Sequence, residues 1–329
     1  MSIAQGSRAS GAATHHGPAS AATSLPHGLR TLVAAHPGGL FLHRDAMTNG
    51  VSSRELAGWV RAGLVRRLSR ATYAIGPAPA EPEDAHRELT RAMLLGHPAL
   101  IASHHSALAL LGVDLCDVDL RRAYGIWTNG SASRTLPTVR LIRPTRVPPY
   151  GHVGGWSCVR PAWAIAQTTA EHGIVAGVAA ADHALHSKIV TMDGLIGAVA
   201  DHEGMRGAAT MRRMLDLCDP RAESVGETRL RLICIDAGIE VEPQFWVLDG
   251  HRRVARADFR VKGTRLLLEF DGMLKYRAAE GQQALEKEKR REDECRRLGW
   301  DFERFTWPAV DRPAFVRSRI HEGLARAAR

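Results

Sequence analysis

The sequence predicts an α/β protein of the α+β multidomain kind. The chain has 329 residues, which is too long for one typical core. Apolar residues recur at helical spacing through its middle. Near the C-terminus, strand-like runs precede a long charged helix, the order typical of an α/β sandwich. We expect a disordered tail at 1–28, a helix–turn–helix domain at 29–78, a mostly helical connecting domain at 79–222 and a sheet domain at 223–329.

The composition favours a protein of the cytoplasm that binds a polyanion. The formal net charge is +9, which favours nucleic acid before a membrane. No apolar run approaches the roughly 20 residues of a membrane span, and the Ala-, Ser- and His-rich N-terminus lacks the apolar region of a signal peptide. The five cysteines form no CxxC pair, which argues against a zinc knuckle and suits a reducing cytosol. We therefore expect a cytoplasmic protein without a membrane partner.

The first folded segment has the pattern of a winged helix. Ser52 and Glu55 have capping-box spacing, which begins a helix that ends before Gly63. We expect three helices at 29–35, 41–48 and 52–62, and two short strands at 64–65 and 73–75. Helix, turn, helix and a two-stranded ribbon together predict a winged helix.

Five arginines lie on the second helix of the pair and on the ribbon: Arg54, Arg61, Arg66, Arg67 and Arg70. Arginine at these places can contact phosphates or read guanine through a bidentate fork. The alternative is a solvated basic surface that meets another domain. Sign, density and position together favour contact with DNA.

The segment RELAGWVRAGLVRRLSRATYAI resembles the N-terminal winged-helix domain of the AbiEi-like family, the antitoxins of type IV abortive-infection systems. The resemblance implies a DNA-binding autoregulator, with DNA as one partner and a cognate toxin protein as another candidate. The glycine that usually precedes the aromatic residue of the last strand is replaced here by Ala71-Thr72. This departure concerns the geometry of the wing.

The middle segment carries no recognisable chemistry. We expect helices at 85–95, 102–111, 163–171, 174–185, 192–200 and 208–217, and strands at 122–127 and 138–142. His104 and His105 are adjacent, so they point to different helix faces, and no histidine follows at i+4. A capping turn with surface histidines is favoured over a metal site. The segment has no P-loop or Rossmann glycine pattern, so we expect no small-molecule cofactor. It resembles the connecting region of AbiEi-like proteins that carry a C-terminal nuclease-like domain.

The C-terminal segment brings carboxylates onto paired strands. We expect helices at 224–237, 282–298 and 314–327, and strands at 244–247, 254–261, 264–270 and 301–306. Glu269 and Asp271 share one face if their strand extends that far. A hairpin centred on Lys262-Gly263 places Asp258 opposite Leu267, diagonal to Glu269 and on the same face. Diagonal neighbours lie about 7–8 Å apart.

Like charges this close repel, and a divalent cation removes the penalty. The sequence therefore predicts that Asp258, Glu269 and Asp271 bind Mg²⁺ (or Mn²⁺), whose preferred ligands are hard oxygens. Such an ion polarises a phosphate and activates a water. A charge that directly follows the apolar run Leu266-Leu267-Leu268 needs a reason of this kind.

The motifs SVGETRLR, RADFR and LLLEFDGMLKY, in this order, resemble the PD-(D/E)XK nuclease superfamily, and most closely its branch similar to the very-short-patch-repair (Vsr) endonuclease. The resemblance implies a restriction-endonuclease-like α/β sandwich and a DNA endonuclease, acting in phage defence or a toxin–antitoxin system. Its catalytic residues would be Glu227, Asp258, Glu269, Asp271 and Lys275. Asp271 stands where a lysine is usual, so Lys275 would supply that charge, and Ala257 replaces the proline before Asp258.

Simpler interpretations remain open for each of these residues. Glu227 follows Ser224 by three residues, so it is also a candidate capping-box glutamate, and it could pair with Arg231. Asp271-Gly272 could form only a turn. Lys289 and Arg291 are candidate nucleic-acid contacts or part of a solvated helix face. The alternative function is a non-catalytic DNA-binding antitoxin or transcriptional regulator with a degenerate nuclease fold.

Overall fold

The structure is a computed structural model that describes residues 25–272 and 280–327, with the backbone alone at 280–288. It divides into two units, Met1–Pro79 and Ala80–Arg329. Helices and sheets occur in both units, so the predicted α/β multidomain class is confirmed. Among the helices described, none combines the length and the apolar character that crossing a membrane requires.

The N-terminal unit has the winged-helix plan that the sequence predicts. Its elements in order are α2 (His27–Ala35), β1 (Leu40–Leu42), α3 (His43–Thr48), α4 (Ser53–Arg61), β2 (Val65–Arg67) and β3 (Thr72–Ile75). The sheet has the order β1-β3-β2. The predicted helix at 41–48 begins only at His43, because Phe41 and Leu42 pair with β3 as a strand. Ser52 and Glu55 form the predicted capping box, since the Ser52 hydroxyl accepts from the Glu55 amide at 3.2 Å.

The second unit begins with a six-stranded sheet in the order β6-β7-β5-β4-β9-β8. Its strands are β4 (Leu100–Ala102), β5 (Ala123–Trp127), β6 (Arg134–Thr135), β7 (Val139–Ile142), β8 (Tyr150–Val153) and β9 (Trp156–Val159). Only β5 and β7 correspond to predicted strands. The other four are short, and a strand of two to four residues leaves little periodicity to recognise.

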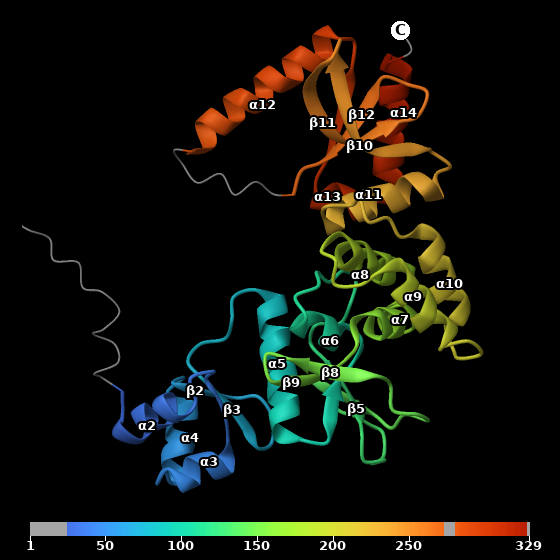
Figure 1. Cartoon of the computed structure of the whole chain (residues 1–329). Helices are drawn as coiled ribbons and strands as arrows, with labels where there is room; N and C mark the ends of the chain where they lie inside the picture. The colour runs from blue at the N-terminus through green and yellow to red at the C-terminus, as the bar shows by residue number, and fades with distance from the viewer. Residues whose placement is uncertain (1–24, 273–279, 328–329) are drawn as a thin grey trace, which may run out of the picture. The chain divides into compact units, whose positions relative to one another are not determined.

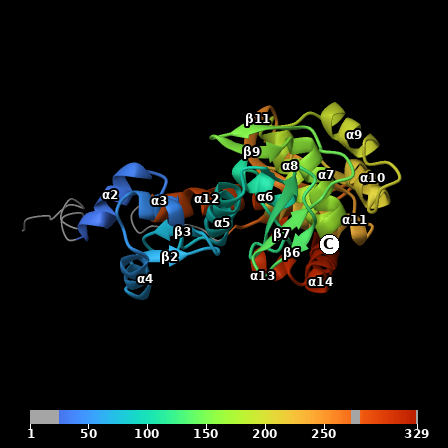
Figure 2. The same cartoon turned by 90° about the horizontal axis from the view of Figure 1, so that it is seen from below.

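Six helices complete this half of the unit. They are α5 (Pro82–Gly96), α6 (His104–Leu110), α7 (Pro161–His172), α8 (Ile174–His186), α9 (Met192–Ala200) and α10 (Ala208–Leu217). Helices α7 to α10 lie together in both views (Figures 1 and 2) and share one hydrophobic core with the sheet. His105 is fully buried, so the surface position that we expect for it is wrong. It hydrogen-bonds His172 at 3.0 Å instead.

The C-terminal half of the second unit is a four-stranded sheet in the order β10-β11-β12-β13, with helices on both faces (Figure 1). Its elements are α11 (Val225–Asp236), β10 (Val241–Asp249), β11 (Arg252–Val261), β12 (Leu266–Phe270), α12 (Glu280–Arg297), β13 (Asp301–Phe305), α13 (Trp307–Val310) and α14 (Pro313–Ala327). One core packs β11 and β12 against α11, α13 and α14. The other packs them against α12. The sandwich architecture therefore agrees with the prediction.

Helix α11 links the two halves of the second unit through buried polar contacts. Arg231 donates to Asp182 of α8 at 2.6 Å, and both side chains are at least 93% buried. The Thr228 hydroxyl donates to the same carboxylate at 2.8 Å. These contacts hold α11 against α8. Separating the two helices would leave buried charges uncompensated, which is costly. The same helix begins beside the predicted carboxylates.

Candidate active site at the C-terminal sheet

The register of β11 and β12 differs from the predicted one. Phe259 pairs with Leu268, and Arg260 pairs with Leu267. The predicted pairing of Asp258 with Leu267 is therefore wrong. The paired residues end one residue before Asp258 on β11 and before Glu269 on β12 as the two strands run past each other.

Asp258 lies between the two strands. Its Oδ2 accepts a hydrogen bond from the backbone amide of Phe270 at 2.7 Å. Burial, helped by the negative charge of Glu227, raises the pKa of Asp258 to about 6, although the Phe270 amide and Arg291 oppose this shift. The hydrogen bond that Asp258 accepts within the described part of the chain is at Oδ2, not at Oδ1. That oxygen keeps its capacity for a ligand.

Glu227 is brought to the site by α11. It does cap its helix, because its amide donates to the Ser224 hydroxyl at 3.2 Å and that hydroxyl donates back to Oε1 at 2.9 Å. Oε2 accepts from the Glu223 amide and from the side chain of Gln244, each at 3.0 Å. Burial raises the pKa of Glu227 despite these hydrogen bonds. The capping interpretation is confirmed, the site interpretation stays a prediction, and the alternative partner Arg231 binds Asp182 instead.

Gly226 allows this approach of α11 to the strands. A Cβ atom at residue 226 would stand 1.9 Å from the ring of Phe270, the residue that follows Glu269. A side chain there would push the first turn of α11 away from β12. Glycine before Glu227 in the SVGETRLR motif therefore has a steric reason.

Glu269 is buried and paired with two arginines. Its Oε1 accepts from Arg291 of α12 at 2.9 Å, and its Oε2 lies 3.1 Å from Arg304 of β13. Arg304 also lies 3.2 Å from Glu292. Arg291 additionally donates to the carbonyl of Arg256 at 3.1 Å, which joins α12 to β11. Arg291, predicted as a nucleic-acid contact, is therefore engaged with the carboxylate site in this structure.

The other predicted site residues are placed less fully. Strand β12 ends at Phe270, but the amide of Asp271 still donates to the Phe305 carbonyl at 2.7 Å. Backbone pairing thus reaches Asp271 beyond the end of β12, and its sharing of a face with Glu269 stays a prediction. Lys275 lies outside the described residues. Lys289 is exposed on α12.

The chemistry of these donors fits a hard divalent cation. Within residues 25–272 and 280–327, no group of three His, Cys, Asp or Glu side chains is arranged to hold a metal ion. Mg²⁺ commonly needs only one or two protein carboxylates, because water and substrate phosphate supply the remaining ligands. The pair of half-buried Asp258 and buried Glu227, with both pKa values raised, meets that requirement.

The arginines of the winged helix fall into two groups. Arg54 and Arg61 lie seven residues apart on α4, hence on one face, and both are exposed, as is Arg70. Arg66 donates from Nε to the Gly76 carbonyl at 2.9 Å. Arg67 donates to the carbonyls of Ser69 and Arg70 at 3.1 and 2.8 Å, which closes the turn between β2 and β3. These two arginines thus serve partly to build the wing.

Two contacts of the site were not predicted. Gln244 donates to Glu227, although nothing in its sequence surroundings marks it. Arg304 stands in the FERFTW segment, but its pairing with Glu269 depends on the parallel register of β12 and β13. Both contacts arise between segments distant in sequence, so only the folded sheet reveals them.

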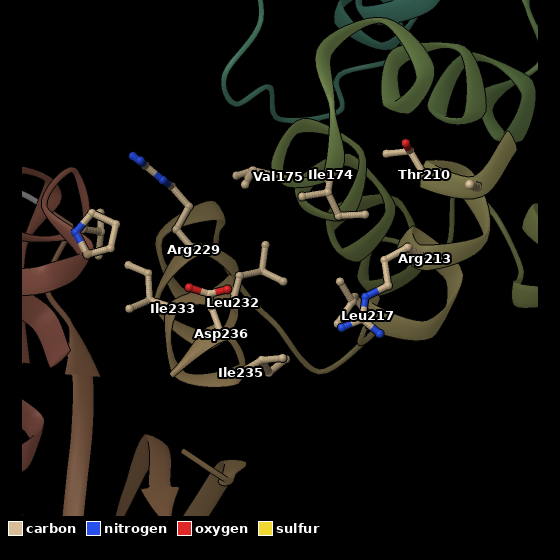
Figure 3. A pocket seen from close by; sticks show the side chains of 13 residues that line it. Ile174, Val175, Thr210, Arg213, Leu217, Arg229, Leu232, Ile233, Ile235 and Asp236 are labelled. Carbon is tan, nitrogen blue, oxygen red and sulfur yellow. The ribbon is translucent and has the colours of Figure 1, made fainter. Parts of the chain in front are cut away.

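A separate groove of about 760 Å³ lies between α8 and α10 on one side and α11 on the other (Figure 3). Apolar side chains such as Ile174, Leu217 and Leu232 line it, together with Arg213 and Arg229. Arg229 forms an ion pair with Asp311 at 2.7 Å. None of the carboxylates described above lines this groove.

No family model matches the chain. The chain is similar to two proteins of Mycobacterium tuberculosis, "Uncharacterized protein MT2308" of strain CDC 1551 / Oshkosh and "Uncharacterized protein Rv2248" of strain ATCC 25618 / H37Rv. Each is 28% identical over 263 residues, which cover 79% of this chain and 93% of the relative. The similarity spans nearly the whole of each relative and assigns no activity.

Proposed function

We propose that this protein is a DNA endonuclease that hydrolyses phosphodiester bonds with Mg²⁺ (or Mn²⁺) at the C-terminal sheet. One observation carries the proposal: Asp258 of β11 and Glu227 of α11 lie close enough for the Glu227 charge to act on Asp258, burial raises the pKa of each, and Arg291 beside Asp258 also pairs with Glu269 of β12. Buried carboxylates that repel one another cost stability and are retained where chemistry uses them. The resemblance to Vsr-like nucleases agrees with this site.

Asp258 would bind the ion through Oδ1, with Glu269 and Asp271 as further ligands. When bound, a divalent cation polarises the scissile phosphate and lowers the pKa of an attacking water. Glu227 would support that water or a ligand beside Asp258. Arg291 and Arg304 lie next to Glu269 and supply positive charge for phosphate oxygens. Lys275 is the candidate that the sequence adds to this role.

The winged helix would hold the DNA. Exposed Arg54, Arg61 and Arg70 provide phosphate contacts, and the net charge of +9 supports a polyanionic partner. We place the protein in the cytoplasm, because all five cysteines are free thiols in this structure, as suits a reducing compartment.

A second function has support from one observation. Both carboxylate oxygens of Glu269 are paired with arginines, which can replace a cation as the neutralising charge. The nuclease fold would then only bind, in a DNA-binding antitoxin or transcriptional regulator. A cognate toxin protein is its candidate partner.

A cleavage assay separates the two functions. Plasmid DNA is incubated with the full chain and Mg²⁺ or Mn²⁺, and the parent is compared with Asp258→Asn and with the control Asp249→Asn. Asp249 is exposed at the end of β10 and pairs with Arg252. It is not one of the carboxylates of the proposed site. We expect the parent and Asp249→Asn to cleave and Asp258→Asn to lose at least about 100-fold in rate. Cleavage by Asp258→Asn at the parental rate contradicts the nuclease proposal. So does a parent protein that cleaves with neither Mg²⁺ nor Mn²⁺.

A further inference from the structure

Gln244 has an unusual backbone for a strand residue. It lies within β10, yet its φ is +55°, the left-handed region that side chains other than glycine rarely adopt. The other non-glycine residues with positive φ in the described chain are His104, Asp117 and Lys188, and none lies inside a strand. Such a conformation persists only where its surroundings impose it, and it often marks a functional site.

The left-handed residue turns its strand over, so that the side chains before and after Gln244 pack on opposite faces of the sheet. In a regular strand, Val241, Phe245 and Val247 share one face. Here Val241 packs in the core with α11, whereas Phe245 and Val247 pack in the core with α12. The break between them falls at Gln244.

The partner strand changes faces at the same level. Phe259 and Val261 belong to the core with α11, and Ala255 and Ala257 belong to the core with α12. Residues 243 and 245 pair with 259 and 257, so Gln244 stands opposite Asp258. The turnover therefore explains why Asp258 lies near charges on both sides of the sheet, namely Glu227 of α11 and Arg291 of α12.

The same turnover gives Gln244 its contact. Its Nε2 donates to Oε2 of Glu227 at 3.0 Å. A neutral amide fixes the direction of a carboxylate without cancelling its charge. An arginine at this place would cancel it, as Arg291 and Arg304 do for Glu269. Glu227 thus keeps a negative charge beside Asp258 for a cation.

We propose that Gln244 is a positioning residue of the candidate cation site, which holds the Glu227 carboxylate against Asp258. This inference rests on the proposed function. It assigns a role to the backbone strain of β10: the strand accepts a left-handed residue so that a neutral donor reaches Glu227.

A double-variant cycle tests the inference, with binding of Mn²⁺ alone measured by calorimetry. Gln244→Asn tolerates the left-handed backbone, but its side chain is one methylene shorter and cannot reach Glu227. We expect it to weaken Mn²⁺ binding by about 10–100-fold, the range for residues that orient metal ligands. Glu227→Gln should also weaken binding. The double variant should bind no more weakly than Glu227→Gln alone, because Gln244 acts through Glu227.

The controls keep the outcomes apart. Lys188→Asn, at another left-handed position outside the site, should bind Mn²⁺ like the parent. Gln244→Gly, which also accepts positive φ, repeats the measurement if Gln244→Asn folds poorly. If Gln244→Asn binds Mn²⁺ like the parent, or if the losses multiply in the double variant, only the role of Gln244 is overturned and the cation site stands. A parent protein that binds no Mn²⁺ overturns the proposed cation site together with this inference.

Discussion

Asp258 lies in an environment that disfavours its ionised form. Burial and the nearby Glu227 raise its pKa to about 6, and the hydrogen bond from the Phe270 amide compensates only in part. At neutral pH the folded protein therefore holds a carboxylate that costs free energy. A bound cation would remove that cost, which links the stability of the second unit to the proposed chemistry.

We predict that Asp258→Asn stabilises the cation-free protein. A pKa raised above the unfolded value means that the folded state binds the extra proton, so stability falls as the pH rises from about 4 through about 6. Asn keeps an acceptor for the Phe270 amide and carries no charge. Urea unfolding in a chelator should show a gain in unfolding free energy of about 2–3 kcal/mol at pH 8 and almost none at pH 4.

Added Mn²⁺ provides the control for this prediction. The cation should raise the unfolding free energy of the parent and leave that of Asp258→Asn nearly unchanged. A variant that is less stable than the parent at pH 8 would mean that the Asp258 charge is stabilised by its surroundings, contrary to the raised pKa.

At this scale the sequence predicts identities better than geometry. Asp258, Glu269 and Glu227 are predicted from their motifs, and in the structure Glu227 lies near Asp258 while Glu269 pairs with two arginines of other elements. The predicted hairpin differs by two residues in register, because Thr264 closes the turn with a hydroxyl bond to the Val261 carbonyl at 2.8 Å. Gln244 carries no sequence signal, since its contact depends on the turnover of a strand. Short sequence motifs indicate the chemistry, whereas strand register and the turnover of β10 depend on packing between distant segments.

At the scale of elements, the sequence does not predict the short strands. Helices α7 to α10 begin and end close to their predicted limits, because each carries several turns of apolar periodicity. Strands β4, β6, β8 and β9 have four residues or fewer, and none shows an alternating pattern long enough to recognise. The same limit hides β1, which has only three residues. Its last two residues fall within the predicted helix at 41–48.

A histidine cluster between α5, α6 and α7 gives this half of the unit a pH dependence. Neutral His105 donates from Nε2 to the Arg122 carbonyl at 3.2 Å, and its Nδ1 accepts from Nε2 of His172 at 3.0 Å. His86 bonds the Leu120 carbonyl and the Ser106 hydroxyl. Burial lowers the pKa of His104 to about 3 and that of His105 to about 2. These rings are therefore neutral parts of the core.

We predict that this cluster makes the protein sensitive to acid. A lowered folded pKa means stability that is present above about pH 6.5 and is lost as the pH falls toward the folded value. Replacing His105 by Gln removes one such group, so the unfolding free energy should depend less steeply on pH, by about 1.4 kcal/mol per unit between pH 5.5 and 3.

Urea unfolding at several pH values measures this slope, with His251→Gln as the control because His251 is exposed beside the β10–β11 turn. The control should keep the slope of the parent. An unchanged slope in His105→Gln would place the acid-sensitive groups elsewhere in the protein.

At the scale of the whole molecule, the two units divide the proposed work. The N-terminal unit has a helix–turn–helix with exposed arginines and a wing, and the second unit has the carboxylate site. The net charge of +9 belongs to the entire chain, so it supports binding to a polyanion without locating the surface. Locating that surface requires a measurement that counts phosphate contacts.

The salt dependence of DNA binding supplies that count. Each arginine that neutralises a phosphate releases a counterion, so the slope of log affinity against log salt falls by about 0.9 when one contact is removed. If Arg54 and Arg61 contact phosphates, the Arg54→Ala/Arg61→Ala variant of the full chain should lose about 2 from the slope, equally on unrelated DNA sequences. Arg91→Ala, an exposed arginine of α5 outside this surface, should keep the parental slope. A loss confined to one DNA sequence would instead assign base recognition to α4, and an unchanged slope would move the DNA-binding surface away from the winged helix.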